Sequence, residues 1–591
     1  MTFFFLPTIL YLFGAVTAPV AGTLGLRARS AYVSGIALFA LLIAVASYPA
    51  ALAGETYWVG DWIPAGSTAY GISLSIDALS WVFLLVITLI GLAVTIYSHS
   101  YPMGEADRSK YYLLLGLLLA AMTGIVLASD LFNLFVFLEI AVLSAVGLVA
   151  FRGEKAALDG AFNYLVLITV GTSFVLLAVI LLYAATGTLN MAQIAAKIAD
   201  APLRDNLAVY AALGLFFVGF SLEAAFMPLH NWLPDAHSGA PSPVSALLSG
   251  VFVKIGLYAL LRILFSVYGL SGASNLLVII GIVSMVGGVL LAFIQTDFKR
   301  LLAYHTVSQL GYVVLAIGLG TPIGIAAGLF HMLNHAIFKA LLFFTAGAII
   351  RKLDTRNLNE MGGLAKKMPL TTLAFTVGAL AISGVPPFNG FASKWLIYNA
   401  TFASNPVITG LALLTSALTL ASFFKVFHGA FLGATPKKYE GLTDVPLSMA
   451  APMLALAALC LIIGLFPFET LNIVIYPALS AVNALGPIAL FGYWDALLWS
   501  GVFAAIVAAL WLAFGLRSRS RTGTAFTCGE PLETRTPVTH FYSAFHEALA
   551  PIFRALESYQ TGSVNDYASY VIIFTAIVAA VLAVGSASWL I

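Results

Sequence analysis

Residues 227–250 read MPLHNWLPDAHSGAPSPVSALLSG and place four prolines between two long apolar runs. The apolar run that precedes them contains a single carboxylate, Glu223. Proline lacks a backbone N–H and interrupts a helix, so we expect the helix that carries Glu223 to break at Pro228 and Pro234. Backbone groups freed inside an apolar medium are tolerated only where protein or water satisfies them, which makes such a break typical of an ion pathway.

The composition indicates a membrane protein. Of the 591 residues, 61% are hydrophobic and only 9% are charged, with a mean hydropathy of +1.01, whereas a soluble domain has about 25% charged residues. Apolar runs long enough to cross a hydrocarbon core of about 30 Å recur from end to end. They are continuously apolar, unlike the alternating strands of a β-barrel. We therefore predict an all-α polytopic membrane protein. Its first apolar run is expected to be a retained helix, because no basic segment precedes it.

The distribution of basic residues predicts the topology. We expect about sixteen spans, which begin near residues 3, 30, 75, 111, 131, 161, 207, 241, 275, 301, 324, 370, 406, 446, 492 and 568. With the N-terminus outside, 20 of the 27 basic residues fall in cytoplasmic loops and two, Lys197 and Arg204, in outer loops. This asymmetry follows the positive-inside rule. We therefore expect both termini on the outer side of the cytoplasmic membrane of a prokaryote.

Five lysine or arginine residues and two glutamates are embedded in the predicted spans. An ionisable group near the bilayer centre costs at least about 2.5 kcal/mol, so such a group usually faces a hydrated, protein-lined interior and has a function there. Two of the seven lie toward span ends, where a long side chain can reach the interface; these are Arg262 and Lys425. The others lie deeper: Glu139, Glu223, Lys254, Lys339 and Lys394.

One segment, HMLNHAIFKALLF, spaces two histidines and one of these lysines along a single helix face. His331, His335 and Lys339 stand at i, i+4 and i+8, and we call these three residues the stripe. Histidine exchanges protons near neutral pH, so the stripe predicts a proton path; hydrogen-bonded interior histidines are the alternative. No nearby Glu or Cys completes a zinc site. The two cysteines, Cys460 in an apolar run and Cys528 in a polar loop, support neither a disulfide nor a metal site.

A second broken helix indicates an internal repeat. Residues 379–398, ALAISGVPPFNGFASKWLIY, carry Pro386 and Pro387 within a span. The two breaks lie about 155 residues apart, each with an ionisable residue, and paired interruptions of this kind are typical of repeated transporter units. An odd number of helices in each unit, five, would require the second unit to be inverted. The expected division is three spans in 1–110, five-helix repeats in 111–265 and 266–432, further spans in 433–515, and an amphipathic segment with the last span in 516–591.

Five stretches of the sequence, in order, resemble the antiporter-like subunits of respiratory complex I. They are residues 128–140, 228–262, 298–312, 331–349 and 384–395. Nearer relatives are the D component of Mrp-type Na+/H+ antiporters and the matching subunits of membrane-bound hydrogenases. The resemblance implies fourteen core helices with two inverted five-helix repeats. It also implies one subunit of a larger membrane complex, with other membrane subunits as partners and no cofactor of its own.

The resemblance also implies roles for individual residues. Glu139 matches the acidic residue of the first repeat, and Lys254 matches the central lysine of the pathway. The stripe matches the hydrated link between the repeats, and Lys394 matches the terminal lysine of the second broken helix. One position departs from the family, because Glu223 stands where a lysine is usual.

The departure at Glu223 leaves several possibilities. If Glu139 and Glu223 approach each other, like-charge repulsion makes them share a proton, or a hard cation such as Na+ binds transiently between them. Alternatively Lys254 pairs with Glu223, and a subunit that does not pump is also consistent. Our working hypothesis is a cluster of Glu139, Glu223 and Lys254.

Two functional classes follow from these features. The first is an ion-translocating subunit of an Mrp-type antiporter that moves H+ and Na+, driven by ion gradients. The second is a proton-pumping subunit of a redox complex whose electron carriers are separate chains, since two cysteines and no CxxC motif leave this chain without an iron–sulfur signature. The net charge of +2 gives no indication of nucleic-acid binding.

Overall fold

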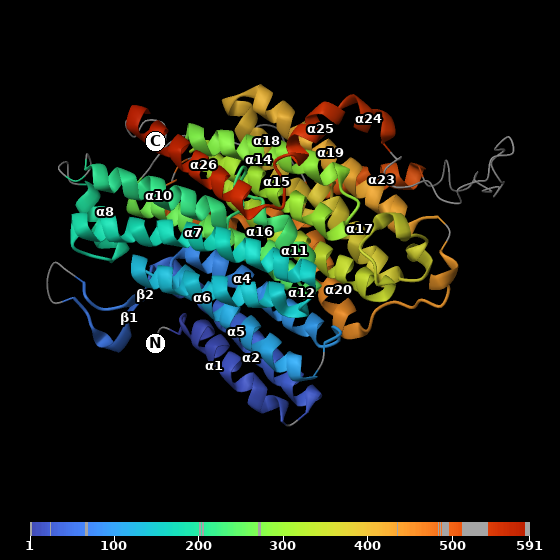
Figure 1. The fold of residues 1–591 in the computed structure, drawn as a ribbon, viewed down its shortest axis with the longest axis horizontal. Coiled ribbons are helices and arrows are strands. Elements are labelled where there is room, and N and C mark those ends of the chain that lie inside the picture. The colour runs from blue at the N-terminus through green and yellow to red at the C-terminus, as the bar shows by residue number, and fades with distance from the viewer. Residues whose placement is uncertain are drawn as a thin grey trace.

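The computed structural model is a bundle of helices with one short hairpin (Figure 1). It describes residues 3–23, 25–64, 69–103, 105–199, 203, 206–269, 274–433, 435–482, 484, 486, 496–510 and 542–585. The strands β1 (Thr56–Trp58) and β2 (Ser73–Ser75) pair antiparallel, with Thr56 opposite Ser75. The prediction of an all-α membrane fold is confirmed.

The helices before and including the first broken helix are α1 (Leu6–Gly22), α2 (Leu26–Ala46), α3 (Tyr48–Ala53), α4 (Ala78–Ser98), α5 (Glu105–Leu127), α6 (Leu131–Val149), α7 (Lys155–Thr186), α8 (Met191–Ala199), α10 (Leu207–Glu223) and α11 (Trp232–Gly239). The next helix combines α12 (Ser242–Leu247), the π-helical turn η3 (Leu248–Phe252), α13 (Val253–Leu261) and the π-helical turn η4 (Arg262–Val267).

The second half of the chain begins with α14 (Asn275–Ile294), α15 (Phe298–Gly318), α16 (Pro322–Leu353), α17 (Pro369–Ser383), α18 (Asn389–Ser404) and α19 (Pro406–Phe431). It ends with α20 (Leu447–Leu465), α21 (Pro467–Thr470), α22 (Tyr476–Ser480), α23 (Ala496–Leu510), α24 (Ser543–Ala548), α25 (Ala550–Glu557) and α26 (Val564–Gly585). Short 3-10 turns lie at η1 (Val59–Asp61), η2 (Ala150–Arg152), η5 (Leu358–Glu360), η6 (Leu364–Lys366) and η7 (Lys437–Tyr439), and a π-helical turn at η8 (Leu471–Ile475).

Every predicted span coincides with a helix. Among the described residues, 12 helices are long and apolar enough to cross a membrane. The remaining four predicted spans meet the shorter helices α1, α10, α17 and α23, so the count of sixteen stays a prediction. Most of the polar segment before α24, with Cys528, lies outside the described residues.

Both broken helices are present, and the first breaks differently from the prediction. Helix α10 ends at Glu223 and α11 begins at Trp232, so the break includes Pro228, as predicted. Pro234 does not break the helix, because it lies in the first turn of α11, where a backbone N–H has no intrahelical partner to lose. In the second break, α17 ends at Ser383 and α18 begins at Asn389.

The two halves repeat a geometry at a constant spacing. Helices α7 and α16 both contain 32 residues and begin 167 positions apart (322 minus 155). An isolated bridge joins Asp130 to Asn190 before α6, and another joins Asp297 to Asn357 before α15, with both partners displaced by the same 167 positions (297 minus 130, 357 minus 190). This correspondence supports two structural units. Their boundaries and the inversion of the second unit stay predictions.

The centre of the bundle consists of three spans, Ser242–Val267, Phe298–Gly318 and Pro322–Leu353, in each of which an apolar stretch of 18 residues is entirely buried. The last two are α15 and α16, and the first is the helix that contains α12 and α13. All three carry ionisable residues. The C-terminal helices lie on the outside of this core: α26 packs against α10, and Phe545 of α24 contacts Phe293 of α14 with ring centroids 5.2 Å apart. The amphipathic segment thus lies against its own chain.

Glycines bring α14 and α15 together along their backbones. A Cβ added at Gly288 would lie 2.6 Å from the backbone nitrogen of Ser308, and one added at Gly318 would lie 2.8 Å from that of Val278. Small residues allow such close approach between membrane helices. The close approach fixes α15, which carries part of the interior site.

This packing predicts the effect of enlarging Gly288. We expect Gly288→Val to destabilise the protein by about 1–3 kcal/mol, as is typical of overpacking, because the new side chain meets backbone that cannot move aside. The measurement is thermal unfolding of the purified protein in detergent. Gly410→Val in α19 is the control, since a Cβ there has no atom within 4 Å. Equal stability of the two variants would contradict the prediction.

Candidate ion pathway

The stripe lies on α16, at the buried centre. All three side chains, His331, His335 and Lys339, are 0% exposed. The rings of the two histidines are nearly parallel, with centroids 6.4 Å apart. Among the described residues, the two ring nitrogens of His335 have no hydrogen-bond partner. The Lys339 ammonium has none in that part of the chain either. The Lys339 ammonium lies 5.8 Å from the centre of the Phe343 ring. Buried polar atoms without protein partners are sites where ordered water binds.

His331 links the stripe to the second broken helix. Its Nδ1 lies 2.9 Å from Ser393 Oγ and its Nε2 lies 3.1 Å from Gln309 Oε1. The residue after Ser393 is Lys394, whose Nζ donates to the Ile382 carbonyl at 2.9 Å and to Ser416 Oγ at 3.0 Å. The ammonium therefore lies at the carbonyl end of α17, which carries partial negative charge. The break of the helix creates this cation site.

Lys254 lies on the other side of the stripe. It is 1% exposed, and its Nζ donates to the Ser249 carbonyl at 2.5 Å, within the π-helical turn η3. Such turns are frequent at functional sites. Lys254 interacts electrostatically with His335 and with Lys339. The structure thus brings Lys254, the stripe and Lys394 into one buried series of ionisable groups.

Glu223 and Glu139 form a separate pair. Glu223 ends α10, is 2% exposed, and has one carboxylate oxygen without a partner among the described residues. Its side chain packs on Gly256, where an added Cβ would lie 2.9 Å from Glu223 Cβ. The carboxylate of Glu139, which is half-buried on α6, lies within electrostatic range of Glu223.

The three-membered cluster of the working hypothesis does not form as expected. Among the described residues, the charge that acts on Glu223 is that of Glu139, whereas Lys254 faces the stripe. The reason is helical geometry: Gly256, which touches Glu223, is two residues from Lys254 and so lies on the opposite face of α13. The carboxylate pair is present, and the lysine belongs to the stripe.

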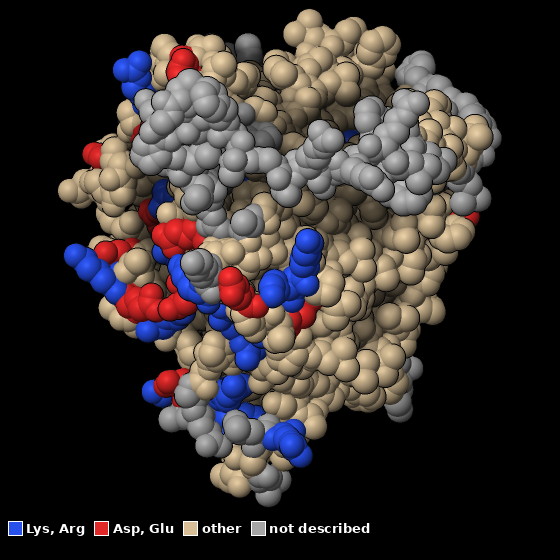
Figure 2. All heavy atoms as spheres, turned by 90° about the vertical axis from the view of Figure 1, so that its right-hand side faces the viewer, with Lys and Arg blue, Asp and Glu red and all other residues tan. Residues whose placement is uncertain are grey.

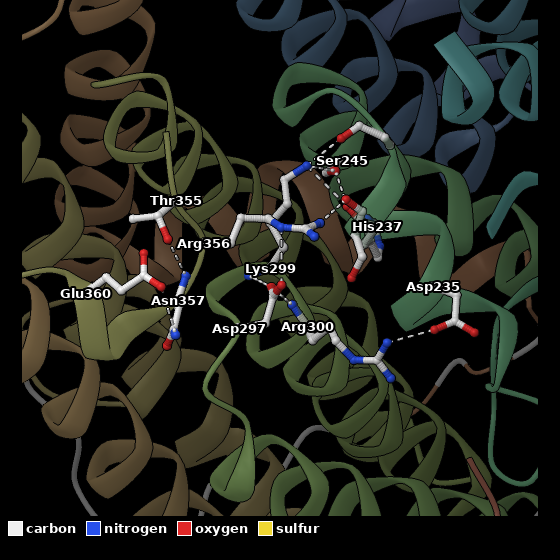
Figure 3. A network of polar contacts seen from close by, with 12 residues as sticks. Asp235, His237, Ser245, Asp297, Lys299, Arg300, Thr355, Arg356, Asn357 and Glu360 are labelled. Atoms are coloured by element: carbon white, nitrogen blue, oxygen red, sulfur yellow. Dashed lines mark hydrogen bonds and ion pairs between the residues drawn. The ribbon is translucent and has the colours of Figure 1, made fainter. Parts of the chain in front are cut away.

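A polar network that sequence reasoning did not single out joins the first broken helix to α15 (Figure 3). The Lys299 ammonium, 2% exposed, donates to the carbonyls of His237, at 3.2 Å, and of Ala240, at the carbonyl end of α11. It also donates to Ser245 Oγ at 3.2 Å. The His237 ring stacks on Phe343, one turn beyond Lys339, with centroids 4.9 Å apart. His237 and Lys299 both lie near helix ends that the sequence predicts, but only the fold brings the two residues together.

Ion pairs surround this network. Arg300 Nη1 lies 2.9 Å from Asp235 Oδ1, and Arg356 Nε lies 3.3 Å from Asp297 Oδ2. Asp297 also caps α15 by accepting the backbone N–H of Arg300 at 3.0 Å. Figure 3 shows these side chains between the two halves of the chain. They connect the loop before α15 to both the first broken helix and the loop after α16.

The two residues that lie toward span ends, Arg262 and Lys425, both have polar partners in the structure. Arg262 pairs with Asp77 and donates to Ser80 Oγ at 2.8 Å and to Tyr258 OH at 2.9 Å. Although burial opposes ionisation, the charge of Arg262 and its hydrogen bond hold the pKa of Asp77 below its ordinary value. Lys425 is 4% exposed and donates to the carbonyls of Phe293 and Gln295.

Asp130 caps α6 as Asp297 caps α15. Asp297 pairs with Arg356, whereas Asp130 has one carboxylate oxygen, Oδ2, without a hydrogen-bond partner among the described residues. The other oxygen of Asp130 accepts the backbone N–H of Asn133 at 2.7 Å. Burial raises the pKa of Asp130 to about 6. No group of three or more His, Cys, Asp or Glu side chains in the described part of the chain is arranged to hold a metal ion.

The fold and this interior define a class of protein: a multi-pass membrane protein with buried ionisable residues along two broken helices. The chain belongs to the NADH:quinone oxidoreductase/Mrp antiporter transmembrane family, whose sequence profile matches residues 128–419. Residues 62–112 match the N-terminal region of complex I chain 5. The family resemblance seen in the sequence is confirmed.

Particular relatives are similar over most of the chain. NADH-quinone oxidoreductase subunit N of Desulforudis audaxviator is 36% identical over 78% of this chain and 96% of its own length. The D component of the Na(+)/H(+) antiporter of Alkalihalophilus pseudofirmus is 32% identical over 73% of this chain and 87% of its own. A chain of the membrane-bound sulfane sulfur reductase, an archaeal respiratory membrane complex, superposes with a TM-score of 0.74 at 34% identity, covering 82% of this chain and 98% of that one. These relatives are subunits of larger membrane assemblies.

The Asp77–Arg262 pair predicts a structural effect separate from ion movement. We expect Asp77→Asn to lower the free energy of unfolding by about 1–3 kcal/mol, because Arg262 loses its charged partner. The part of this contribution that depends on ionisation is present above about pH 4 and disappears as the pH falls through the lowered pKa of Asp77. Thermal unfolding of both proteins as a function of pH measures it. A stability difference that persists unchanged well below pH 4 would contradict this account.

Proposed function

We propose that this chain is the ion-translocating subunit of an Mrp-type cation/proton antiporter complex. One observation carries the proposal: a buried series of ionisable groups runs from Lys254 through the stripe to Lys394. The members of this series are all basic, so they repel one another strongly in a low-dielectric interior. They cannot all be protonated together, and a series with vacant proton sites can pass protons along.

A broken helix fixes one end of this series, and a π-helical turn fixes the other. Lys394 is held by the carbonyl end of α17 and Lys254 by the Ser249 carbonyl. Each ammonium therefore has a resting position, from which it can release a proton toward the stripe. Water bound at the unpartnered atoms of His335 and Lys339 would complete the path.

We infer that the carboxylate pair provides the cation specificity. Glu139 and Glu223 are within electrostatic range, and two carboxylates in an apolar region are neutralised by a shared proton or by a hard cation. Exchange of Na+ for H+ at this pair fits an antiporter. Glu139 lies among exposed apolar side chains of α6, including Val136 and Ile140, and a neighbouring membrane subunit is proposed to cover this face.

A redox-driven complex is the second candidate. It is favoured by the similarity over most of the chain to NADH-quinone oxidoreductase subunit N and to the sulfane sulfur reductase. The two candidates differ in what drives ion movement and not in the path. In inverted membrane vesicles that carry the whole complex, an antiporter responds to an imposed Na+ gradient, whereas a redox pump responds to an electron donor.

We propose that the protein lies in the cytoplasmic membrane with both termini outside. Lys, Arg, Asp and Glu side chains gather on the face seen in Figure 2, which is the right-hand side of Figure 1. The start of α1 and the end of α26 lie on the left in Figure 1, on the same side as α8 and the hairpin. This arrangement supports a charged cytoplasmic face opposite the termini.

Lys254→Met tests the path directly. We expect the variant to reduce ion-driven pH change in inverted vesicles to the background of vesicles without the complex, because methionine keeps the length of the side chain but carries no proton. Lys352→Met is the control; Lys352 lies at the end of α16 and donates to Thr443 at 3.4 Å near the surface. Normal transport by an assembled Lys254→Met complex would overturn the proposed path.

Glu223→Gln tests the carboxylate pair. Glutamine keeps the shape and hydrogen bonding of a protonated glutamate but cannot ionise. If the pair exchanges ions, the variant loses most transport and any dependence on Na+, measured with a lumen-pH dye over a series of Na+ concentrations. Near-normal transport with unchanged Na+ dependence would assign Glu223 a packing role, with Lys254 and the stripe as the remaining path.

A further inference from the structure

We propose a second proton branch, formed by Lys425, Ser422, His305 and Gln309, which joins the stripe at His331. The inference rests on the proposed function of the stripe and adds an uptake route to it. The four residues come from α19 and α15. All four are buried, with Lys425 the most exposed at 4% and the other three at 0%.

Lys425 forms the outer end of the branch. Its ammonium lies at the carbonyl end of α14, where it donates to the Phe293 carbonyl and, at 3.0 Å, to that of Gln295. Gln295 precedes Asp297 and Lys299 by a few residues, so the site adjoins the loop that the positive-inside rule assigns to the cytoplasm. The branch therefore begins on the side of the basic loops.

His305 connects this end to the interior. Its Nε2 lies 2.9 Å from Oγ of Ser422, which precedes Lys425 by three residues and so shares its face of α19. The other ring nitrogen, Nδ1, is buried without a hydrogen-bond partner among the described residues. The charges that act on His305 are those of Lys339, Lys394 and Lys425. The imidazole thus lies between the lysine at the mouth and the lysines of the main path.

Gln309 completes the connection. It follows His305 by one helical turn on the same face of α15. Its Oε1 lies 3.1 Å from Nε2 of His331, and its Nε2 is buried without a partner among the described residues. The side chains of His305 and Gln309 are therefore neighbours along one helix face, and a bridging water between their unpartnered atoms would join them.

The chemistry of the branch is proton transfer and not metal binding. A histidine can take up a proton on one nitrogen while it releases one from the other, and the hydroxyl of Ser422 can both donate and accept. The C-terminal segment covers the mouth: the Tyr542 ring lies 5.0 Å from that of Phe293, and its hydroxyl donates to the Ala421 carbonyl at 3.2 Å.

The first test replaces His305 by glutamine in the whole complex in inverted vesicles. Glutamine can keep a hydrogen bond to Ser422 but cannot be protonated. We expect a loss of transport rate of about tenfold or more, because a positioned proton carrier contributes on the order of 10²–10⁴ in rate and water bridges part of the gap. His230→Gln is the matched control, since His230 is also buried but, among the described residues, no lysine charge acts on it.

The second test separates proton transfer from structural capping of α14. Lys425→Arg keeps a cation that can donate to the Phe293 and Gln295 carbonyls, but arginine does not release its proton. We expect the assembled variant to slow transport as Lys425→Met does. A purely structural lysine would instead be replaced by arginine without loss while the methionine variant fails to assemble, and that result would overturn the proposal.

The outcomes also distinguish this proposal from the function on which it rests. Slow transport in His305→Gln and Lys425→Arg, together with none in Lys254→Met, supports both. Normal transport in His305→Gln with none in Lys254→Met overturns the branch and leaves the main path intact. Normal transport in both His305→Gln and Lys254→Met overturns the path and the branch together.

Discussion

The structure depends on the cost of burying an ammonium group in an apolar interior. A free charge there is prohibitively unfavourable, so a charged lysine needs oxygen atoms around it. Four of the five buried lysines in the described part of the chain have such partners, and Lys339 is the exception. The protein supplies them from helix ends and helix irregularities: α17 ends beside Lys394, α11 beside Lys299 and α14 beside Lys425, while a π-helical turn serves Lys254. Carbonyls at a helix end have no intrahelical donor, and they carry the negative end of the helix dipole. Broken helices and buried lysines are therefore two aspects of one arrangement.

The repeated geometry places different chemistry in each half. Helices α7 and α16 correspond at a spacing of 167 positions, so Tyr164 occupies the place of His331 (331 minus 164). Tyr164 stacks on Trp232 with centroids 4.6 Å apart and interacts electrostatically with Glu223. The first half thus places an aromatic residue near Glu223 of the carboxylate pair, whereas the second half carries the stripe. Under the proposed function, two similar frameworks give one cation-selective region and one proton-conducting region.

The separation of these regions bears on how ion exchange and proton movement are coupled. Lys254 faces the stripe, whereas Gly256, two residues later, packs against Glu223. Helix α13 is thus the shared wall between the carboxylate pair and the proton series. A change in the charge of Glu223 or in its packing acts on that helix directly. The same architecture suits an antiporter and a redox pump, because neither drive needs a different path.

The sequence alone determined the class of the protein, both broken helices and most of the ionisable residues, because a charge in a long apolar run is costly enough to be conspicuous. The family resemblance added roles to those residues, and the family is confirmed. The sequence did not determine which side chains these residues contact. Lys254 was expected beside Glu223, and only the rotation of α13 shows that it faces away. Pro234 was expected to break a helix, but its place in the first turn of α11 makes it compatible with one. His305, Gln309 and Lys299 gain their significance from helices distant in the chain, and only tertiary packing brings those helices together.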